Sequence, residues 1–200
     1  LHPPAHPPLT QVSPLRMHQL QTFGGLDLRG ADGQAVGALL QQPRRMALLA
    51  YLAAHRPGAL LRRDRLLLLF WPGLDDGRGR AALSQALHVI RRTLGAEALV
   101  TRGTEEVGLD PAHVGADVTR FLETEGAQDW AAMDQVYTGE FLPGFHLGDA
   151  PEFGQWLDET RTALRRQACQ AASRLAEAAV AGGEAAAAVA WRRQALSHDP

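Results

Sequence analysis

The stretch GRGRAALSQALHVIRRTLG, residues 77–95, carries the clearest structural pattern in this chain. At 100° per residue of an α-helix, four apolar side chains fall within about 60° of one another. These four are Leu83, Leu87, Ile90 and Leu94. Gly95 suits the end of the helix, because glycine readily adopts the backbone conformation that follows a last helical turn. The stretch therefore predicts an amphipathic helix over 77–94 with one buried edge.

The opposite side of this helix carries a polar row. It contains Arg78, Ala81, Gln85, His88 and Arg92, with Ser84 beside it and Arg80 and Arg91 on its flanks. Arginine can bind guanine through two hydrogen bonds, glutamine can bind adenine, and flanking arginines can neutralise phosphates. The row therefore fits the major groove of DNA. A plain solvated face would also carry such residues, so the helix alone leaves that alternative open.

A hairpin and a helix are expected before this stretch. Residues 17–23 and 26–28 alternate between apolar and polar side chains around Gly24-Gly25, which is typical of two paired strands. Pro43 suits the first turn of a helix, and Pro57-Gly58 ends that helix. Its expected buried stripe consists of Met46, Leu49, Leu52 and Ala53.

A second helix and a second hairpin complete the pattern. The helix covers about 63–71 and stops at Pro72-Gly73. Two short strands, 99–101 and 107–109, surround a turn at 102–106. Strands, three helices and a hairpin follow one another in the order of a winged helix.

Charge is divided unevenly along the chain. Residues 1–110 hold thirteen arginines against nine acids, and residues 111–200 hold seven against thirteen, although the net charge is only −2. Between Arg44 and Arg92 the count is ten arginines to three acids, and no basic residue is a lysine. This asymmetry indicates a first half that faces nucleic acid and a second half that faces solvent or a protein partner.

Further arginines stand where a winged helix would meet phosphates. Arg62 and Arg63 lie at the start of the second helix, whose N-terminal amides also favour an anion, and Arg102 enters the wing turn. Pairing of these side chains with neighbouring surface acids is the alternative. Glu105 and Glu106 in the same turn would repel a phosphate backbone, which indicates either weak DNA binding or a wing that points away from DNA.

Beyond residue 111 the composition shifts to Ala, Glu and Gln, which favours helices. We expect helices at about 116–124 and 127–137, a long helix that starts near Pro151 and ends at Gly182-Gly183, and a last helix at 184–197. We therefore divide the chain into a disordered Pro/His-rich arm at 1–16, a winged-helix domain at 17–111 and an all-helical domain at 112–200.

The last stretch, residues 183–200, has the form of the second helix of a TPR repeat. Glycine opens it, Asp-Pro closes it, and Ala188, Ala195 and Leu196 occupy the packing positions. An Ala-rich helix outside any repeat is the alternative. On the TPR interpretation we expect further repeats after Pro200.

Several classes of function find no support in the residues. The chain has no phosphate-binding glycine loop, no HExxH motif and no nucleophile elbow, so we expect no enzyme, no cofactor and no metal site. Its single cysteine, Cys169, excludes an internal disulfide. The longest apolar run, 66–71, is far too short to span a bilayer, and no signal segment opens the chain. We expect a cytoplasmic protein without a membrane partner.

Five stretches resemble the SARP-type bacterial transcriptional activators. They are PRRMALLAYL (43–52), LLLLFWP (66–72), RAALSQALHVIRRTLG (80–95), ADVTRF (116–121) and YTGEFLPGF (137–145). The resemblance implies an OmpR-like winged helix followed by a TPR-like bacterial transcriptional activator domain. It also implies binding to promoter repeats and recruitment of RNA polymerase.

The sequence departs from that family at two places. The groove helix has Ala81, Ser84 and Val89 where members usually carry more arginine, and the wing has Glu105-Glu106-Val107 in place of a glycine–aromatic pair. These departures put the strength of DNA binding in question and leave the expected fold unaffected.

Two functional hypotheses follow. In the first, the protein is a transcriptional activator that binds double-stranded promoter DNA, as a dimer, and contacts RNA polymerase. Its base-facing residues are Arg78, Ser84, Gln85, His88 and Arg92, and its phosphate contacts are Arg62, Arg63, Arg80, Arg91 and Arg102. In the second, it is a regulatory module without useful DNA affinity, whose helical domain binds a protein or a small effector.

Overall fold

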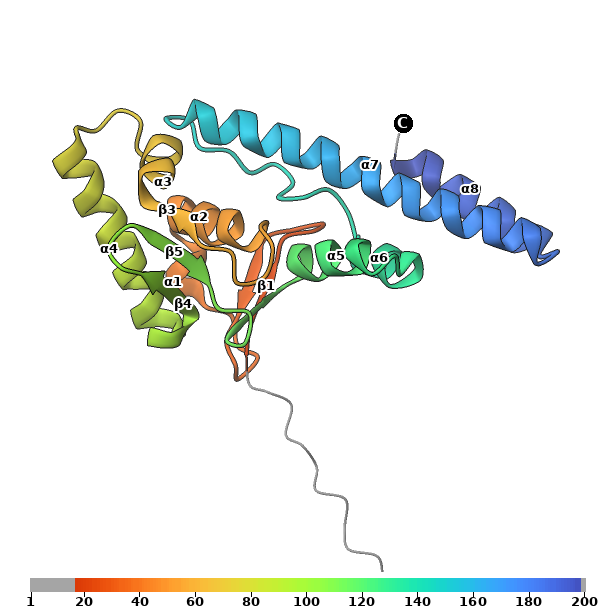
Figure 1. Ribbon diagram of the computed structural model, residues 1–200, viewed down its shortest axis with the longest axis horizontal. Helices are drawn as coiled ribbons and strands as arrows, with labels where there is room; N and C mark the ends of the chain where they lie inside the picture. The colour runs from red at the N-terminus through yellow and green to blue at the C-terminus, as the bar shows by residue number, and fades with distance from the viewer. Residues whose placement is uncertain (1–16, 199–200) are drawn as a thin grey trace, which may run out of the picture.

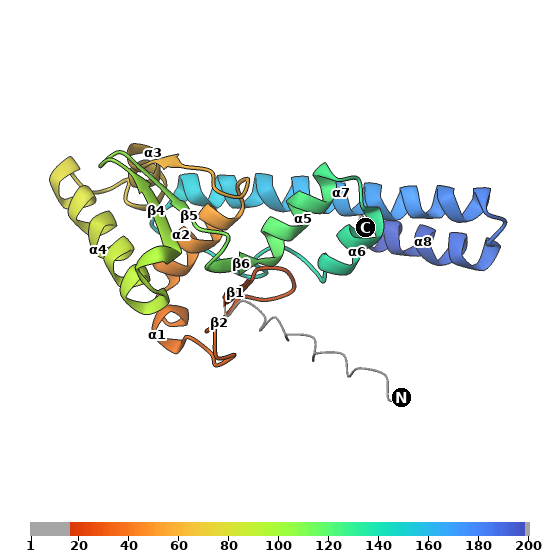
Figure 2. The same cartoon turned by 60° about the horizontal axis from the view of Figure 1, so that its bottom comes forward.

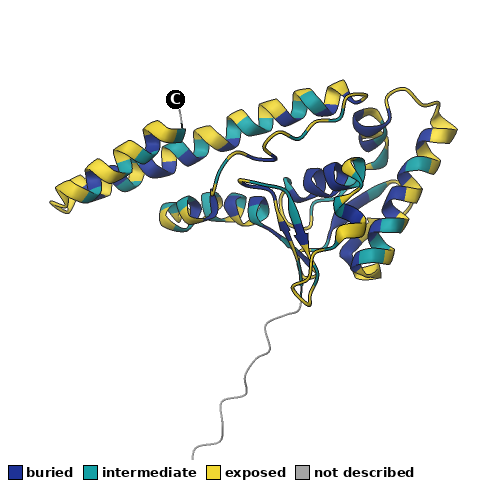
Figure 3. Cartoon of the chain, turned by 180° about the vertical axis from the view of Figure 1, so that it is seen from behind, coloured by how far each residue is buried: buried dark blue, intermediate teal, exposed yellow. Residues whose placement is uncertain are grey.

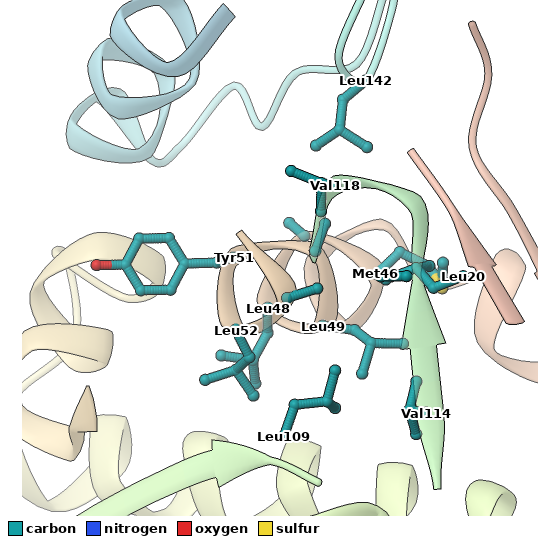
Figure 4. Packing of buried hydrophobic residues seen from close by; sticks show 14 of the residues in the cluster. Leu20, Met46, Leu48, Leu49, Tyr51, Leu52, Leu109, Val114, Val118 and Leu142 are labelled. Atoms are coloured by element: carbon teal, nitrogen blue, oxygen red, sulfur yellow. The ribbon is translucent and has the colours of Figure 1, made fainter. Parts of the chain in front are cut away.

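The structure is a computed structural model that describes residues 17–198. Helix α2 (Pro43–Ala53) lies at the centre of the molecule. All eight residues from Met46 to Ala53 are buried. The predicted stripe is confirmed, and the residues between its members are buried as well. Figure 4 shows the reason, since apolar side chains from both halves of the chain surround the helix: Leu20, Leu109, Val114, Val118 and Leu142.

One small sheet supports α2 and contains strands from both ends of the winged-helix segment. Strands β1 (His18–Gln21) and β2 (Asp27–Arg29) form the predicted antiparallel hairpin. Strand β6 (Val114–Ala116) pairs parallel with β1, in the order β2-β1-β6. The expected boundary at 111/112 therefore falls just before a strand of the first sheet. One apolar cluster also runs from Leu20 to Ala171, so the division into two domains stays a prediction.

A second sheet forms the wing. Strands β4 (Leu99–Arg102) and β5 (Glu106–Leu109) are the predicted hairpin, and the two-residue strand β3 (Leu61–Arg62) pairs with the other edge of β5. Gly108 of β5 is needed for this packing, because an added Cβ would lie 2.1 Å from the carbonyl oxygen of Ala59.

The remaining helices of the winged helix agree with the sequence pattern to within a residue or two. Helix α3 (Arg63–Phe70) and helix α4 (Asp76–Leu94) are the second and third predicted helices. A short helix α1 (Gly37–Leu40) and a 3₁₀ turn η1 (Ala96–Ala98) were not expected. Figures 1 and 2 show α4 at the outer edge of the molecule, beside the β4–β5 wing.

Four helices follow β6. Helix α5 (Asp117–Gly126) lies beside β1, and α6 (Trp130–Val136) packs against α5 and α7. Helices α7 (Pro151–Ala181) and α8 (Ala185–His198) form a long antiparallel hairpin (Figure 1). The fold is thus mainly α with a small β component: a winged helix-turn-helix followed by an all-helical, TPR-like part.

Aromatic side chains join the start of α7 to the winged helix. The ring of Phe153 lies 5.2 Å from that of Phe70, and the ring of Trp156 lies 4.6 Å from that of Tyr51. Aromatic pairs at such distances stabilise an interface beyond the area that they bury. The start of α7 is therefore packed against α2 and α3.

The predicted packing of the last helix is confirmed for two of its three residues. Ala188 and Ala195 are buried, as expected, but Leu196 is 71% exposed. Ala188 and Ala195 are the buried residues of α8, whose main packing partner is α7. Leu196 lies on another side of α8, which no element of residues 17–198 covers.

A half-buried carboxylate, that of Asp117, holds α5 against β1. Asp117 accepts hydrogen bonds from the backbone amides of Thr22 and Phe23, at 2.8 and 2.9 Å, and from the hydroxyl of Thr22. Thr22 is fully buried and is the one polar residue in the buried set of residues 17–198. These bonds satisfy backbone donors that would otherwise be left unpaired at the end of β1.

We predict that Asp117→Ala lowers the free energy of unfolding by about 3 kcal/mol, since it leaves several buried donors without an acceptor of comparable strength. Chemical denaturation measures the change. Asp129→Ala serves as the control, because this exposed carboxylate caps α6 with a single hydrogen bond to the amide of Ala132, and its removal should cost only about 1 kcal/mol. Equal losses for the two variants would show that the Asp117 cluster contributes no more than an ordinary cap.

Candidate nucleic-acid interface

Helix α4 presents an exposed ridge to solvent. Its predicted buried edge is confirmed, because Leu83, Leu87, Ile90 and Leu94 are all buried. Figure 3 shows the division between the buried and exposed sides of the helix. The five residues predicted to face bases are all exposed: Arg78, Ser84, Gln85, His88 and Arg92. The structure thus brings these side chains to one accessible surface, and their role in DNA binding stays a prediction.

The first turn of α4 is held by its own cap. The carboxylate of Asp75 accepts a hydrogen bond from the amide of Arg78 at 2.9 Å, and its other oxygen lies 3.4 Å from Nε of Arg78. Such a cap satisfies one of the helix's free amides. The Arg78 side chain is 80% exposed. Because an ion pair this exposed is weak, Arg78 remains available to another anion.

On one side of the ridge, α3 and the wing enclose a depression of about 210 Å³. Its polar lining comes from Arg63, Asp64, Arg80, Ser84, Thr104 and Glu105. The amide of Arg63 donates to the carbonyl of Glu105 at 2.8 Å, which joins the start of α3 to the wing. Nε of Arg63 is buried and has no hydrogen-bond partner within residues 17–198. This depression therefore contains a cation that is incompletely satisfied.

The other predicted phosphate contacts are paired with acids at the surface. Guanidinium nitrogens of Arg62 and Arg80 lie 3.5 and 3.8 Å from the carboxylate of Asp64. Arg102 pairs with Glu106 directly across the wing hairpin. Arg91, in the last turn of α4, is half-buried. The alternative of surface pairing thus describes three of these arginines in the free protein.

One of the two acids in the wing turn is paired with an arginine. Glu106 is neutralised locally by Arg102, and only Glu105 is left without a basic partner among the described residues. The carboxylate of Glu105 accepts a hydrogen bond from the hydroxyl of Thr104 at 3.1 Å and lines the depression that contains Arg63. One uncompensated acid, rather than two, therefore stands at the wing.

On the other side of the ridge lies a second depression, of about 350 Å³, which the sequence analysis missed. Its lining includes Arg44, Arg45, Trp71 and Gln85. The guanidinium of Arg44 lies over the ring of Trp71, 5.8 Å from its centroid, and pairs with Asp149. This hydrogen-bonded ion pair lowers the pKa of Asp149. The basic pair Arg44-Arg45 was the available signal in the sequence.

The described part of the chain shows neither a metal-binding arrangement nor a membrane-spanning helix. Within residues 17–198, no three histidine, cysteine or acidic side chains gather in an arrangement that could bind a metal ion. Over the same residues, no helix combines the length and the apolar character needed to cross a membrane. Cys169 is a free, half-buried thiol of α7.

We predict that Asp75→Ala lowers the free energy of unfolding by about 1 kcal/mol and increases amide exchange in the first turn of α4, because the cap is removed. Hydrogen exchange monitored by mass spectrometry locates the effect. Asp76→Ala is the control. Asp76 lies in the same turn, and its replacement removes only a favourable charge at the helix start, worth about 0.3–1 kcal/mol. Unchanged exchange in Asp75→Ala would contradict the role of this cap.

The fold is similar to a solved structure of Mycobacterium tuberculosis EmbR in complex with a low-affinity phosphopeptide. The two superimpose with a TM-score of 0.64 at 22% sequence identity, over 86% of this chain and 48% of the EmbR chain. This chain thus spans about half the length of the EmbR structure. No protein-family model and no curated protein sequence matches it. The likeness identifies the fold that carries the α4 ridge and its two basic flanks.

Proposed function

We propose that this protein is a cytoplasmic, sequence-specific DNA-binding transcriptional activator. In this proposal it binds promoter repeats as a dimer and contacts RNA polymerase. The observation that carries the proposal is the ridge of α4, which is exposed along its polar row and lies between two depressions that contain arginine. The resemblance of the sequence to the SARP-type activators supports the same function.

The polar row would lie in the major groove of DNA, which is about 12 Å wide and admits one helix. Gln85 and His88 are exposed at the middle of α4, where they would reach base edges. Arg78 and Arg92 lie toward the two ends and would bind guanine or a phosphate, and Ser84 would contact a base beside Gln85. Direct contacts of this kind distinguish one base pair from another.

The flanking arginines would hold the phosphate backbones. Arg62, Arg80 and Arg102 are each 64–70% exposed, and exposed ion pairs contribute only about 0–1 kcal/mol. Phosphates can therefore displace their partners Asp64 and Glu106 at little cost. Arg63 and Arg91 would add contacts beside the ridge.

The helical part, residues 112–200, would contact RNA polymerase and could receive a protein or small effector. Its charge is opposite in sign to that of the winged helix, because the chain from residue 111 onward holds seven arginines against thirteen acids. A surface of that sign repels DNA and leaves the part free for protein contacts.

One observation favours a second candidate, a regulatory module that does not bind DNA. Glu105 stands at the wing without a basic partner among the described residues, and Asp64 and Glu106 already form ion pairs with three arginines. In that case the winged-helix surface would bind a protein. Mobility-shift binding to the DNA upstream of the protein's own gene, repeated at several salt concentrations, separates the two candidates.

We predict that Gln85→Ala or His88→Ala reduces the preference for operator over random DNA by about 1–3 kcal/mol, the worth of one good hydrogen-bonded pair with a base. Arg63→Gln should instead weaken binding to both DNAs equally and flatten the dependence on salt, since a phosphate contact carries no sequence information. Arg174→Gln, an exposed arginine of α7, controls for net charge. Binding equal to that of the parent in all these variants would mean that the ridge is only a solvated surface.

We also predict that replacing Glu105 and Glu106 with Gln tightens binding to operator and random DNA alike. The change removes two charges near the phosphates and releases Arg102 from its partner. The gain should be largest at low salt, because the Debye length is about 10 Å at 0.1 M. The control replaces Glu123 and Glu184, two exposed acids outside the winged helix. If this control gains as much, the wing does not approach the DNA.

A further inference from the structure

The ridge of α4 has two flanks. Of the predicted phosphate contacts, Arg63 and Arg80 line the depression on the flank that contains α3 and the wing, and Arg62 and Arg102 belong to the wing strands β3 and β4. Ser84 faces that flank, where it lines the depression with Arg63. Gln85 faces the opposite flank, where it lines the depression with Arg44 and Arg45. A helix in the major groove has a phosphate backbone on each side, so the second flank requires cations of its own.

Arg44 already binds an anion in this position. Its guanidinium pairs with the Asp149 carboxylate and lies over the Trp71 ring, 5.8 Å from the ring centroid. Trp71 is itself buried, at 9% exposure, so the ring gives the guanidinium a fixed support. An arginine that lies over an aromatic ring and pairs with a carboxylate is also placed to pair with a phosphate, because both anions accept hydrogen bonds from the guanidinium.

The two partners of this ion pair are unequally exposed. The Arg44 side chain is 29% exposed, and that of Asp149 is 72% exposed. Asp149 belongs to the loop that leads into α7, which begins two residues later at Pro151. Its carboxylate can therefore return to water when another anion replaces it, whereas Arg44 stays on Trp71. Arg45 lines the same depression and forms no ion pair within residues 17–198.

We propose that Arg44 and Arg45 bind the second phosphate backbone, and that Asp149 is an internal competitor that DNA displaces from Arg44. This inference rests on the proposed DNA-binding function and extends it to the control of affinity. The helical part of the chain supplies the competing charge, so it reduces the affinity of the winged helix for any DNA. The competition is independent of sequence, because the displaced carboxylate and the incoming phosphate meet the same guanidinium.

The test compares Asp149→Asn with Glu152→Gln in mobility shifts on operator and random DNA over a range of salt concentrations. Glu152 is a matched control: it is an exposed acid in the first turn of α7, three residues away, with no ion pair among the described residues. Asp149→Asn should tighten binding to both DNAs by about two- to fivefold more than the control, as expected for release of one exposed ion pair. Glu152→Gln changes the net charge equally and leaves Arg44 occupied.

Two further variants examine the cations. Arg44→Gln and Arg45→Gln should each weaken binding to both DNAs and reduce the slope of log affinity against log salt by about 0.9. In the Arg44→Gln background, Asp149→Asn should increase the affinity for DNA no more than Glu152→Gln does, because no guanidinium remains to be released. Arg45→Gln keeps the experiment decisive if the replacement of Arg44 disturbs the packing on Trp71.

The outcomes separate this inference from the proposed function. If the parent binds operator DNA but Asp149→Asn gains no more than Glu152→Gln, the competition is refuted and DNA binding stands. If Arg44→Gln and Arg45→Gln both keep the parent's salt slope, the second flank does not hold phosphates. If the parent binds no DNA even at low salt, the proposed function fails and this inference fails with it.

Discussion

The burial of α2 from Met46 to Ala53 is the constraint on which the rest of the structure depends. A helix that is apolar on every side needs cover in every direction. The wing strand β5 supplies Leu109, the first sheet supplies Leu20 and Val114, and the helical segment supplies Val118 and Leu142. The winged helix is thus not closed by its own residues. A fragment that ended at residue 111 would leave α2 open to water on the side that β6 and α5 cover.

The same packing fixes the position of the long helix relative to the winged helix. The start of α7 lies against α2 and α3 through Phe153 and Trp156. Arg161 of α7 donates hydrogen bonds to the backbone carbonyls of Phe141, at 3.0 Å, and of Leu142, which holds the preceding loop in place. That loop carries Asp149 to Arg44. A contact between the acidic and basic halves of the chain therefore arises from core packing. It places the carboxylate of Asp149 on Arg44, beside the α4 ridge.

Weak ion pairs reconcile a surface rich in arginine with a stable free protein. Arginines crowded without counter-charges would repel one another, and Asp64, Asp75, Glu106 and Asp149 reduce that repulsion. In each pair at least one partner is well exposed, so each pair contributes little to stability. On the proposed function, the acids of this surface would lower the affinity for DNA without abolishing it.

Local sequence pattern was sufficient to predict α4, which forms the ridge, and the β1–β2 hairpin. The spacing of Leu83, Leu87, Ile90 and Leu94, the glycine at 95 and the alternation around Gly24-Gly25 predicted α4 and the β1–β2 hairpin, because helix faces and tight turns depend on neighbours in the sequence. The polar row of α4 followed from the same period. Its exposure was therefore predictable, although its binding partner was not.

Other features depended on contacts between distant residues. Strand β3 has only two residues and forms because it pairs with the edge of β5. Strand β6 has only three residues and forms because it pairs with β1. The second flank of α4 joins Arg44 to Asp149 across 105 positions. No local period marks such pairs, since they arise only when the burial of α2 brings both halves of the chain together. Sequence pattern thus determined which helix is presented, and tertiary packing decided which charges surround it.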